Sequence, residues 1–281
     1  MRQKLTPSRL ALTSARYFGL LLILMGILTP YVVMMLTSMT PQTELIAAGA
    51  SLVPSELSFN AYKELIQSTP FLEYLRNSLL VALMSVPMTL ICATGAAIAL
   101  SRFEFWGRRQ VMTLLILAQM LPAVLLVLSL QSQLSALGLL DSKLGLALVH
   151  TAFATPFSTW LLKGFLDSIP RELEESGQID GASTWQIIRL LIMPLLAPGL
   201  VASGTYAFIL TWNEFLYALT FTSGPATRTL PVGLHLFIGD YQIRWDLLTA
   251  GGVLSVLPVI IGFLLVQRKL VAGLAAGAVK G

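Results

Sequence analysis

The sequence predicts an all-α integral membrane protein with six transmembrane helices, and three observations lead to that fold class. The 281 residues are 56% hydrophobic and only 11% charged, whereas soluble domains carry about 25% charged residues. Long apolar runs recur along the chain, and a run of about 20 helical residues is enough to cross a bilayer. Basic residues gather between alternate runs, as they do in multi-pass proteins. They account for the net charge of +4, which therefore requires no nucleic-acid partner.

The chain begins with a basic segment, residues 1–16, followed by an uncharged run, residues 17–39. This run is longer than the apolar part of a signal peptide and has no small-residue cleavage site. We therefore expect a cytoplasmic N-terminus and a retained first transmembrane helix. Residues 40–76 are mixed and polar, so we expect an external loop with a short helix near Asn60–Gln67.

Residues 77–268 are expected to form a core with five further spans. Their expected bounds are Asn77–Ser101, Gln110–Gln131, Leu144–Phe165, Leu195–Thr222 and Leu247–Gln267. A basic turn around Arg102 and Arg108 separates the first two of these spans, and a loop at Ser132–Lys143 follows the second. Arg268 and Lys269 are expected to close the last span, which leaves residues 269–281 as a cytoplasmic C-terminal tail.

Prolines and small residues are spread through these spans. Each of the six expected spans holds one proline: Pro30, Pro87, Pro122, Pro156, Pro198 and Pro258. Membrane helices tolerate proline when neighbours satisfy the freed carbonyls, so we expect ordinary kinks rather than hinges. The pairs Ala93/Ala97 and Gly199/Ser203 predict close helix packing. Cys92 is the single cysteine, which excludes an intrachain disulfide, and we expect it to pack as a small apolar residue.

The basic residues also predict the orientation of the spans. With the N-terminus inside and six spans, thirteen of the eighteen Lys and Arg residues fall on the cytoplasmic side. Cytoplasmic loops carry such an excess in membrane proteins. The count favours an even number of spans with both ends inside, and it places the loop between the fourth and fifth spans in the cytoplasm.

That cytoplasmic loop, Asp167–Pro198, is charged and amphipathic although it lies between apolar runs. We expect Ser168 to cap a first short helix and Asp180-Gly181 to form a turn. Ser183 with Gln186 three residues on fits a capping box for a second helix, which Pro194 is expected to end. Such a helix pair fits a docking surface for a soluble partner or an amphipathic pair resting on the lipid surface.

The same stretch resembles the EAA loop of ABC importer permeases, whose pattern is E-A-A, then D-G-A, then a hydrophobic helix ending in L-P. Here the pattern stands as Glu175-Ser176-Gly177, Asp180-Gly181-Ala182 and Met193-Pro194. Serine and glycine replace the two alanines, and methionine replaces the leucine. The spacing matches, so residues 167–194 are identified as an EAA coupling loop.

Three further stretches extend the resemblance along the chain in the right order. Trp212–Leu216 is similar to a segment in the fifth span of carbohydrate-importer permeases, and Thr229–Leu234 is similar to their following external loop. The ending Gly273–Gly281 is close to that of the maltose-type, second-permease subunits. The chain therefore resembles the carbohydrate branch of these permeases, with their type I importer fold.

The resemblance implies a set of partners in a bacterial inner membrane. They are a second, homologous permease subunit in a heterodimer, two ATPase subunits that bind ATP and Mg, and an external solute-binding protein. No cofactor is expected in this chain itself, and membrane lipid surrounds it. The resemblance assigns the coupling role to these residues: Glu174, Glu175, Gly177, Asp180, Gly181, Ala182 and Pro194. The resemblance implies that their helix docks in a groove of the ATPase and passes its motion to the spans.

Glu214 is the only formal charge within the expected fifth span, and charged groups inside membranes are functional candidates by default. With Asn213 and Tyr217 it forms a polar cluster at positions i, i+1 and i+4. The cluster fits a sugar translocation path, and it equally fits a polar clamp between helices. Gln119 and His150 are weaker candidates of the same kind.

Other function classes lack their signatures in this sequence. There is no Walker-type phosphate loop, no nucleophile–base constellation and no metal-binding spacing, so no catalytic or metal site is expected. A secondary carrier predicts several charged residues within the spans and inverted repeats, and only Glu214 is present. A permease for a non-sugar solute, such as a glycerol phosphodiester or a polyamine, is the alternative that stays open.

Overall fold

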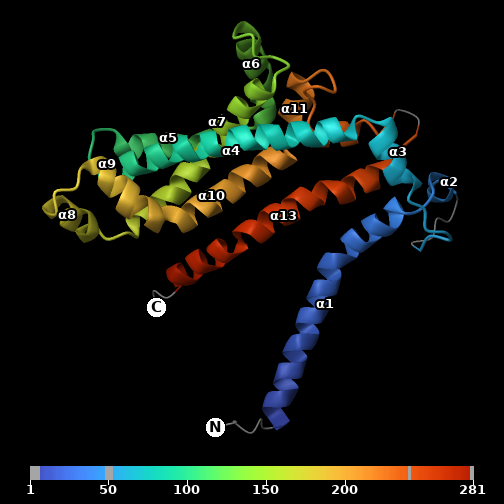
Figure 1. Ribbon diagram of the computed structural model, residues 1–281, viewed down its shortest axis with the longest axis horizontal. Helices are drawn as coiled ribbons and strands as arrows, with labels where there is room; N and C mark the ends of the chain where they lie inside the picture. The colour runs from blue at the N-terminus through green and yellow to red at the C-terminus, as the bar shows by residue number, and fades with distance from the viewer. Residues whose placement is uncertain (1–6, 48–52, 240–241, 279–281) are drawn as a thin grey trace. The chain divides into compact units, whose positions relative to one another are not determined.

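The computed structural model describes residues 7–47, 53–239 and 242–278, and every regular element in these ranges is a helix (Figure 1). The predicted all-α class is therefore confirmed. The chain forms two compact units, each with its own internal contacts. One takes the residues up to Thr69 together with Leu234–Val256, and the other takes Pro70–Gly233 and the residues from Leu257 on.

The first unit begins with α1 (Pro7–Ser38), which contains the expected first span except for its last residue, Met39. It continues through α2 (Gln42–Leu45) to α3 (Asn60–Ser68), the short helix expected near these residues. The hydroxyls of Ser38 and Tyr62 share a hydrogen bond of 2.6 Å. This bond ties the end of α1 to α3, so the first span and the polar loop after it are held together.

Arg244 holds the same polar loop to the start of α13 (Trp245–Ala278). Its guanidinium donates to the two carboxylate oxygens of Glu64 at 3.0 and 2.9 Å, and to those of Asp246 at 3.0 Å each. Gln42 adds a bond from its side-chain amide to the carbonyl of Ile243, at 2.7 Å. A planar guanidinium suits such a double fork, and it fixes α3 against the beginning of the last helix.

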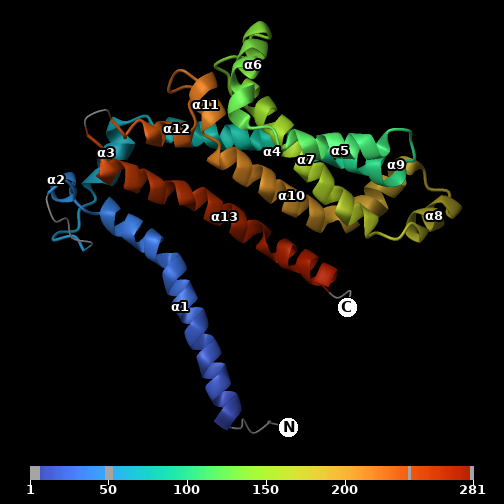
Figure 2. The ribbon, with the colours of Figure 1, turned by 180° about the vertical axis from the view of Figure 1, so that it is seen from behind.

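The second unit is built around three long helices that lie side by side (Figure 2). These are α4 (Phe71–Arg102), α7 (Lys143–Asp167) and α10 (Met193–Asn213). Ala93 and Ala97 are fully buried in their shared core. A methyl group on Gly199 would lie 2.8 Å from the Phe165 ring. Small residues thus allow the close packing that the sequence predicts.

Within the part of the chain that the structure describes, four helices are long and apolar enough to cross a membrane: Thr13–Ser38, Phe71–Arg102, Thr184–Asn213 and Trp245–Gln267. A fifth candidate is the bent pair discussed below, and α7 is not among them. Polar residues such as Thr151, Thr155 and Thr159 lie along α7, and each of these hydroxyls donates to a carbonyl four residues back. Such local bonds satisfy hydroxyls inside a helix. The six-span count stays a prediction.

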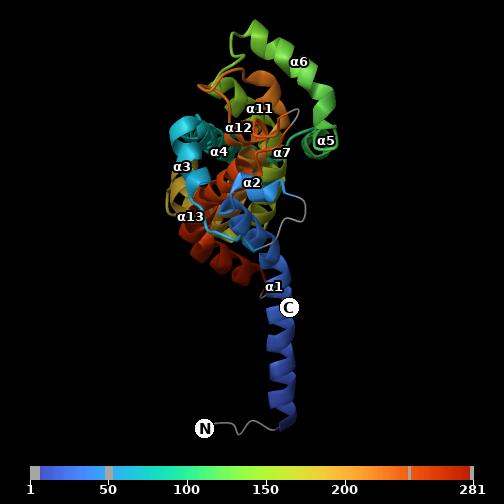
Figure 3. The same ribbon diagram turned by 90° about the vertical axis from the view of Figure 1, so that its right-hand side faces the viewer.

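The expected third span, Gln110–Gln131, is not one helix. It is divided into α5 (Arg108–Ala118) and α6 (Ala123–Ala136), which are bent by 101° (Figure 3). Pro122 is the residue before α6, in an extended conformation. Its ring would clash with the carbonyl of Ala118 in a continuous helix, and it offers no N–H. The expected ordinary kink at Pro122 is therefore wrong, because the helix breaks there. Pro87, in contrast, lies inside an unbroken helix.

The expected fifth span, Leu195–Thr222, is also wrong at both ends. Its helix α10 ends at Asn213, Glu214 is extended, and a separate short helix, α11 (Leu216–Phe221), follows. At its beginning, Pro194 does not end the preceding helix. It lies in the first turn of α10, directly after η1 (Ile187–Ile192), a π-helical segment.

The π-helical segment explains why Pro194 is tolerated. The N–H of Met193 donates to the carbonyl of Ile188, five residues back, where an α-helix would use four. This wider turn shifts the ladder of hydrogen bonds just before the residue that lacks an N–H. The helix therefore continues through Pro194 instead of stopping there.

Three smaller expectations also change. The helix of the sixth span continues past Lys269 to Ala278, although the part that is apolar enough to cross a membrane ends at Gln267 as expected. Arg and Lys are good helix formers, so the two charges do not end the helix. The expected external loop at Thr229–Leu234 contains α12 (Leu230–His235). Cys92 is exposed on the surface of the chain. Residues 1–6 of the N-terminal segment and 279–281 of the tail lie outside the described residues.

Candidate functional site

The EAA-like stretch begins as a turn at the end of α7. Ser168 does not cap the next helix as expected; it ends α7, and its hydroxyl donates to the carbonyl of Phe165 at 2.7 Å. The following helix, α8 (Glu172–Ile179), starts one turn later, after Arg171, and has no side-chain cap. Its first turn instead holds three glutamates, which favour the positive end of a helix.

A tight turn at Gly181 ends α8. Gly181 has φ +80°, and its N–H donates to the carbonyl of Gln178 at 3.0 Å. The N–H of Ala182 donates to the carbonyl of Gly177, also at 3.0 Å. These two bonds form a Schellman motif, which needs a left-handed residue that glycine adopts without strain. The expected positive φ at Gly181 is confirmed.

The second short helix is α9 (Thr184–Gln186), and its expected capping box is present. The Ser183 hydroxyl accepts from the Gln186 N–H, and the Gln186 side chain accepts from the Ser183 N–H. Helix α9 then runs directly through η1 into α10. We call α8, the Gly181 turn, α9 and η1 the coupling element. It is continuous with a long membrane helix.

The inner side of α8 packs on η1 through Gly177. A methyl group at Gly177 would lie 3.0 Å from Cδ1 of Leu191 and 3.3 Å from Cγ1 of Ile187. Ile187 and Ile192 are buried in one core with residues of α4, α7 and α10. The coupling element is therefore folded back on itself and joined to the core of the second unit.

An ion pair fixes α8 to the end of α4. The guanidinium of Arg102 contacts the carboxylate of Glu174, and the two side chains are 9% and 16% exposed. Arg102 also donates to the carbonyl of Ile169 at 3.3 Å, and Arg171 donates to the carbonyl of Ser101 at 3.0 Å. Glu174 thus faces its own chain rather than the surroundings.

Asp167 extends this polar anchor to α7. It lies beyond the expected end of the fourth span, and it pairs with Lys163 while the Ser101 hydroxyl donates to it at 2.6 Å. Burial alone would raise the pKa of Asp167, but the hydrogen bonds from Lys163 and Ser101 outweigh burial and lower that pKa. The carboxylate therefore stays charged and holds the ends of α4 and α7 together.

The outer side of the coupling element is exposed. Glu175 and Asp180 present their carboxylates to the surroundings. Ile179 is 86% exposed and Trp185 is 68% exposed. Ala182 is partly buried against the core, and Pro194 lies just beyond the element, in the first turn of α10. An acidic and apolar surface on a rigid frame is suited to docking a protein partner.

The residues that anchor this element are not evident from the sequence; they are Ser101, Arg102, Lys163, Asp167 and Arg171. They come from three separate segments. The available signal was the position of Arg102 and Lys163 at span ends, facing a stretch rich in glutamate.

The Glu214 cluster is a second candidate site, and its geometry is that of a clamp. One carboxylate oxygen of Glu214 accepts from the N–H of Tyr217 at 2.8 Å, and the other accepts from the N–H of Ala218 at 3.0 Å. Glu214 therefore caps α11. Its second oxygen also lies 3.2 Å from Nε2 of His150, which is 1% exposed. The carboxylate joins α7 to the break after α10.

The other members of that cluster point elsewhere. Asn213 is exposed, and its amide donates to the carbonyl of Ile209 at 2.9 Å. Tyr217 is buried and stacks on Phe153 with ring centroids 5.0 Å apart. The helix break after Asn213 separates these residues, so they do not form the single helical face that the spacing predicts. Gln119, a weaker candidate, donates to the carbonyl of Phe153 at 2.7 Å.

Comparisons with known proteins give one consistent result. Residues 86–275 match the family described as binding-protein-dependent transport system inner membrane component. The chain is 35% identical over 266 residues to the sulfoquinovosyl glycerol transport system permease protein SmoH of Agrobacterium fabrum, covering 95% of this chain and 93% of that protein. It is 34% identical over 256 residues to the diacetylchitobiose uptake system permease protein DasC of Streptomyces coelicolor, covering 91% and 93%.

A solved structure has the same fold. The crystal structure of a bacterial ABC transporter involved in the import of the acidic polysaccharide alginate contains a chain that matches with a TM-score of 0.77. The two chains are 23% identical, and the match covers 94% of this chain and 98% of that one. The similarities thus extend over nearly the whole chain rather than over the coupling element alone.

Proposed function

This chain belongs to the family of binding-protein-dependent transport system inner membrane components, and on that premise we propose that it moves a sugar or oligosaccharide through an ATP-driven importer. A family member of this kind is a multi-pass membrane component without catalysis of its own. The sugar is supported by the relatives, because the names of SmoH and DasC specify a sugar glyceride and a chitin disaccharide. Because these two relatives are named for different glycosides, they support a class of substrate for this chain and do not identify one compound.

The remaining subunits follow from the family and from the shape of the coupling element. The chain pairs with a second, homologous permease subunit, two ATPase subunits hold ATP and Mg, and a binding protein delivers solute from outside. The family description itself names dependence on a binding protein. The positive-inside count supports cytoplasmic termini and a cytoplasmic coupling element.

The observation that carries the coupling role is the division of α8 into two sides. Glu174 and Gly177 bind the element to its own chain, while Glu175, Asp180, Ile179 and Trp185 stay exposed. A rigid connection inward and a free surface outward are what a transmitter of rigid-body motion requires. Glu175 and Asp180 therefore contact basic residues of an ATPase subunit, and Glu174 serves as the inner anchor.

The Glu214 cluster divides in a similar way. Glu214 and Tyr217 hold the helix break through His150 and Phe153. Asn213 is exposed at the end of α10 and is the member free to meet a sugar hydroxyl. Replacing Asn213 by alanine lowers transport without lowering the melting temperature. If Asn213→Ala transports normally, Asn213 is not part of the path.

Gly181 provides the test of the coupling role, with Gly138 as its matched control. Both glycines have positive φ, +80° and +66°, and neither has a heavy atom within 4 Å of an added Cβ. Valine at either position therefore costs about 1–2 kcal/mol of backbone strain. Only Gly181 lies in the coupling element, since Gly138 lies in the loop between α6 and α7.

The experiment purifies each variant through a tag on this chain and measures how much ATPase subunit is retained, then measures ATP hydrolysis stimulated by the binding protein. We expect Gly181→Val to lose the ATPase subunits or the stimulation, and Gly138→Val to retain the ATPase subunits. Equal retention and normal stimulation in Gly181→Val would refute the coupling role.

A further inference from the structure

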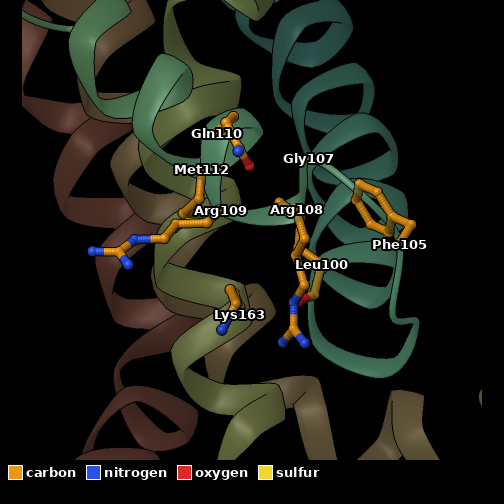
Figure 4. A pocket seen from close by; sticks show the side chains of 8 residues that line it. All are labelled: Leu100, Phe105, Gly107, Arg108, Arg109, Gln110, Met112 and Lys163. Atoms are coloured by element: carbon orange, nitrogen blue, oxygen red, sulfur yellow. The ribbon is translucent and has the colours of Figure 1, made fainter.

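A cleft of about 460 Å³ lies where the turn after α4, the start of α5 and the last part of α7 meet (Figure 4). Three cations line it, Arg108, Arg109 and Lys163, beside the apolar side chains of Leu100 and Met112. No acidic residue is among its lining residues. The cleft is at the end of α4 and α7 that carries the coupling element, but none of that element's residues line it.

Much of this positive charge is not used inside the chain. Arg108 donates from Nε to the carbonyl of Leu100 at 2.6 Å, and its terminal nitrogens make no hydrogen bond within the described residues. The Arg109 side chain forms no ion pair in the part of the chain that the structure describes. Lys163 shares its charge with Asp167. In Figure 4 the ends of Arg108 and Lys163 point to the same side, and Arg109 extends away from them. The cleft therefore favours an anion.

An apolar cleft of about 590 Å³ adjoins the cationic one. The two share Met112 and Lys163. The second has an apolar part between α5 and α7 over Ile116, Trp160 and Leu161, and a polar end lined by Asp167, the ion-pair partner of Lys163, and by Ser168. An anion without a tail would leave this second cleft empty. A molecule with an anionic head and a hydrocarbon chain fills both.

The turn beside the clefts has the composition of a membrane interface. Phe103, Phe105 and Trp106 are all exposed there, and Trp106 is 97% exposed. Aromatic residues gather at the depth of lipid headgroups, where one side of the ring is apolar and the other is wet. This places the cationic cleft at headgroup depth and the apolar part of the second cleft, around Ile116 and Trp160, within the hydrocarbon region.

We propose that the two clefts together bind one anionic phospholipid, with its phosphate among Arg108, Arg109 and Lys163 and an acyl chain along Ile116, Trp160 and Leu161. Basic pockets between helices on the cytoplasmic side bind such headgroups in other membrane proteins. The site is separate from the sugar path and from the exposed side of the coupling element, so it goes beyond the transport function proposed above.

The test uses Trp160 as the reporter in the assembled transporter, reconstituted in vesicles. Lipids brominated in the acyl chain quench a nearby tryptophan, and the difference between the wild type and Trp160→Phe isolates the signal of Trp160. We expect brominated phosphatidylglycerol to quench Trp160 in preference to brominated phosphatidylcholine. We expect Arg109→Gln and Lys163→Gln each to reduce that preference about fivefold, because one Lys or Arg near an anionic lipid strengthens binding by about that factor.

Arg76→Gln is the matched control. Arg76 is an exposed cation near the start of α4, at the end of that helix opposite to the cleft, so the variant removes the same charge from a position that does not line either cleft. It should keep the wild-type preference. The proposal is overturned if both lipids quench Trp160 equally in the wild type, or if Arg76→Gln loses the preference as much as Arg109→Gln does. It is also overturned if inorganic phosphate displaces the lipid at millimolar concentration, because the cleft would then be a site for free phosphate.

Discussion

The ion pair between Arg102 and Glu174 joins α8 to the end of α4, so its removal is the sharpest perturbation of the coupling element. Both side chains are largely buried. Truncating one partner of a fully buried pair costs about 3–5 kcal/mol. Arg102 keeps bonds to the Ser101 hydroxyl at 3.1 Å and to the Ile169 carbonyl at 3.3 Å. These remaining partners reduce the expected cost of Glu174→Gln to about 1–3 kcal/mol.

Glu172→Gln is the matched control for this perturbation. Glu172 lies in the same first turn of α8, is exposed, and forms no ion pair within the described residues. Both variants lose the favourable interaction of a carboxylate with the helix end, about 0.3–1 kcal/mol. Only Glu174→Gln also loses the contact with Arg102. The difference between the two variants therefore isolates the ion pair.

The assay is thermal unfolding of the purified chain, alone and with its ATPase subunits, for Glu174→Gln, Arg102→Gln and the double variant. We expect the double variant to be more stable than the sum of the single losses predicts, by about 1–3 kcal/mol. Additivity within about 0.5 kcal/mol would refute the anchor. A loss of ATPase binding with unchanged stability of the chain alone would show instead that Glu174 contacts the partner.

Three further predictions concern single residues. Gly177→Ala should raise the melting temperature slightly, because alanine gains up to about 1 kcal/mol in a helix and the methyl group meets side-chain atoms alone, Cδ1 of Leu191 at 3.0 Å and Cγ1 of Ile187 at 3.3 Å; a clear fall would show that these two side chains have no room to move. Hydrogen bonds from Ser223 and Thr227 lower the pKa of Asp141 in the folded chain. The ionised carboxylate therefore stabilises the fold fully at a pH above about 3.9, the pKa of an unfolded aspartate. This stabilisation is lost as the pH falls through the lowered pKa. Melting temperatures across that acid range should therefore fall more in the wild type than in Asp141→Asn, and parallel curves would contradict this. Arg244→Lys should cost about 1–2 kcal/mol in thermal unfolding, because lysine cannot reproduce the fork to Glu64 and Asp246, whereas Arg76→Lys should cost nothing measurable.

The turn of the coupling element was predictable because its chemistry is local. The capping box needs only Ser183 and Gln186 three residues apart, and the Schellman turn needs a glycine after Asp180. Each is specified within a few residues, so no distant packing has to be known. The long apolar helices were predictable for the same kind of reason, since hydropathy is summed over one segment.

Helix breaks inside apolar runs were not predictable in this way. Pro87 and Pro122 look alike in the sequence, yet α4 passes through Pro87 and the chain bends by 101° around Pro122. The break at Glu214 has no proline or glycine to announce it. Two contacts of Glu214 stabilise the break: its carboxylate lies next to His150 of α7, and it accepts a hydrogen bond from the first turn of α11. Contacts between distant segments decide these cases.

The three glutamates in the first turn of α8 show that contacts between distant segments also decide which residues of a candidate site face inward. Glu172, Glu174 and Glu175 are equivalent by composition, but Arg102 at the end of α4 selects Glu174 as the inner member. Gly177 is likewise turned inward against Leu191. An EAA-like pattern therefore combines residues that hold the element to its own chain with residues that are exposed on its outer side. Changes at Glu174 and Gly177 should alter the stability of the isolated chain, whereas changes at Glu175 and Asp180 should alter only its assembly with an ATPase.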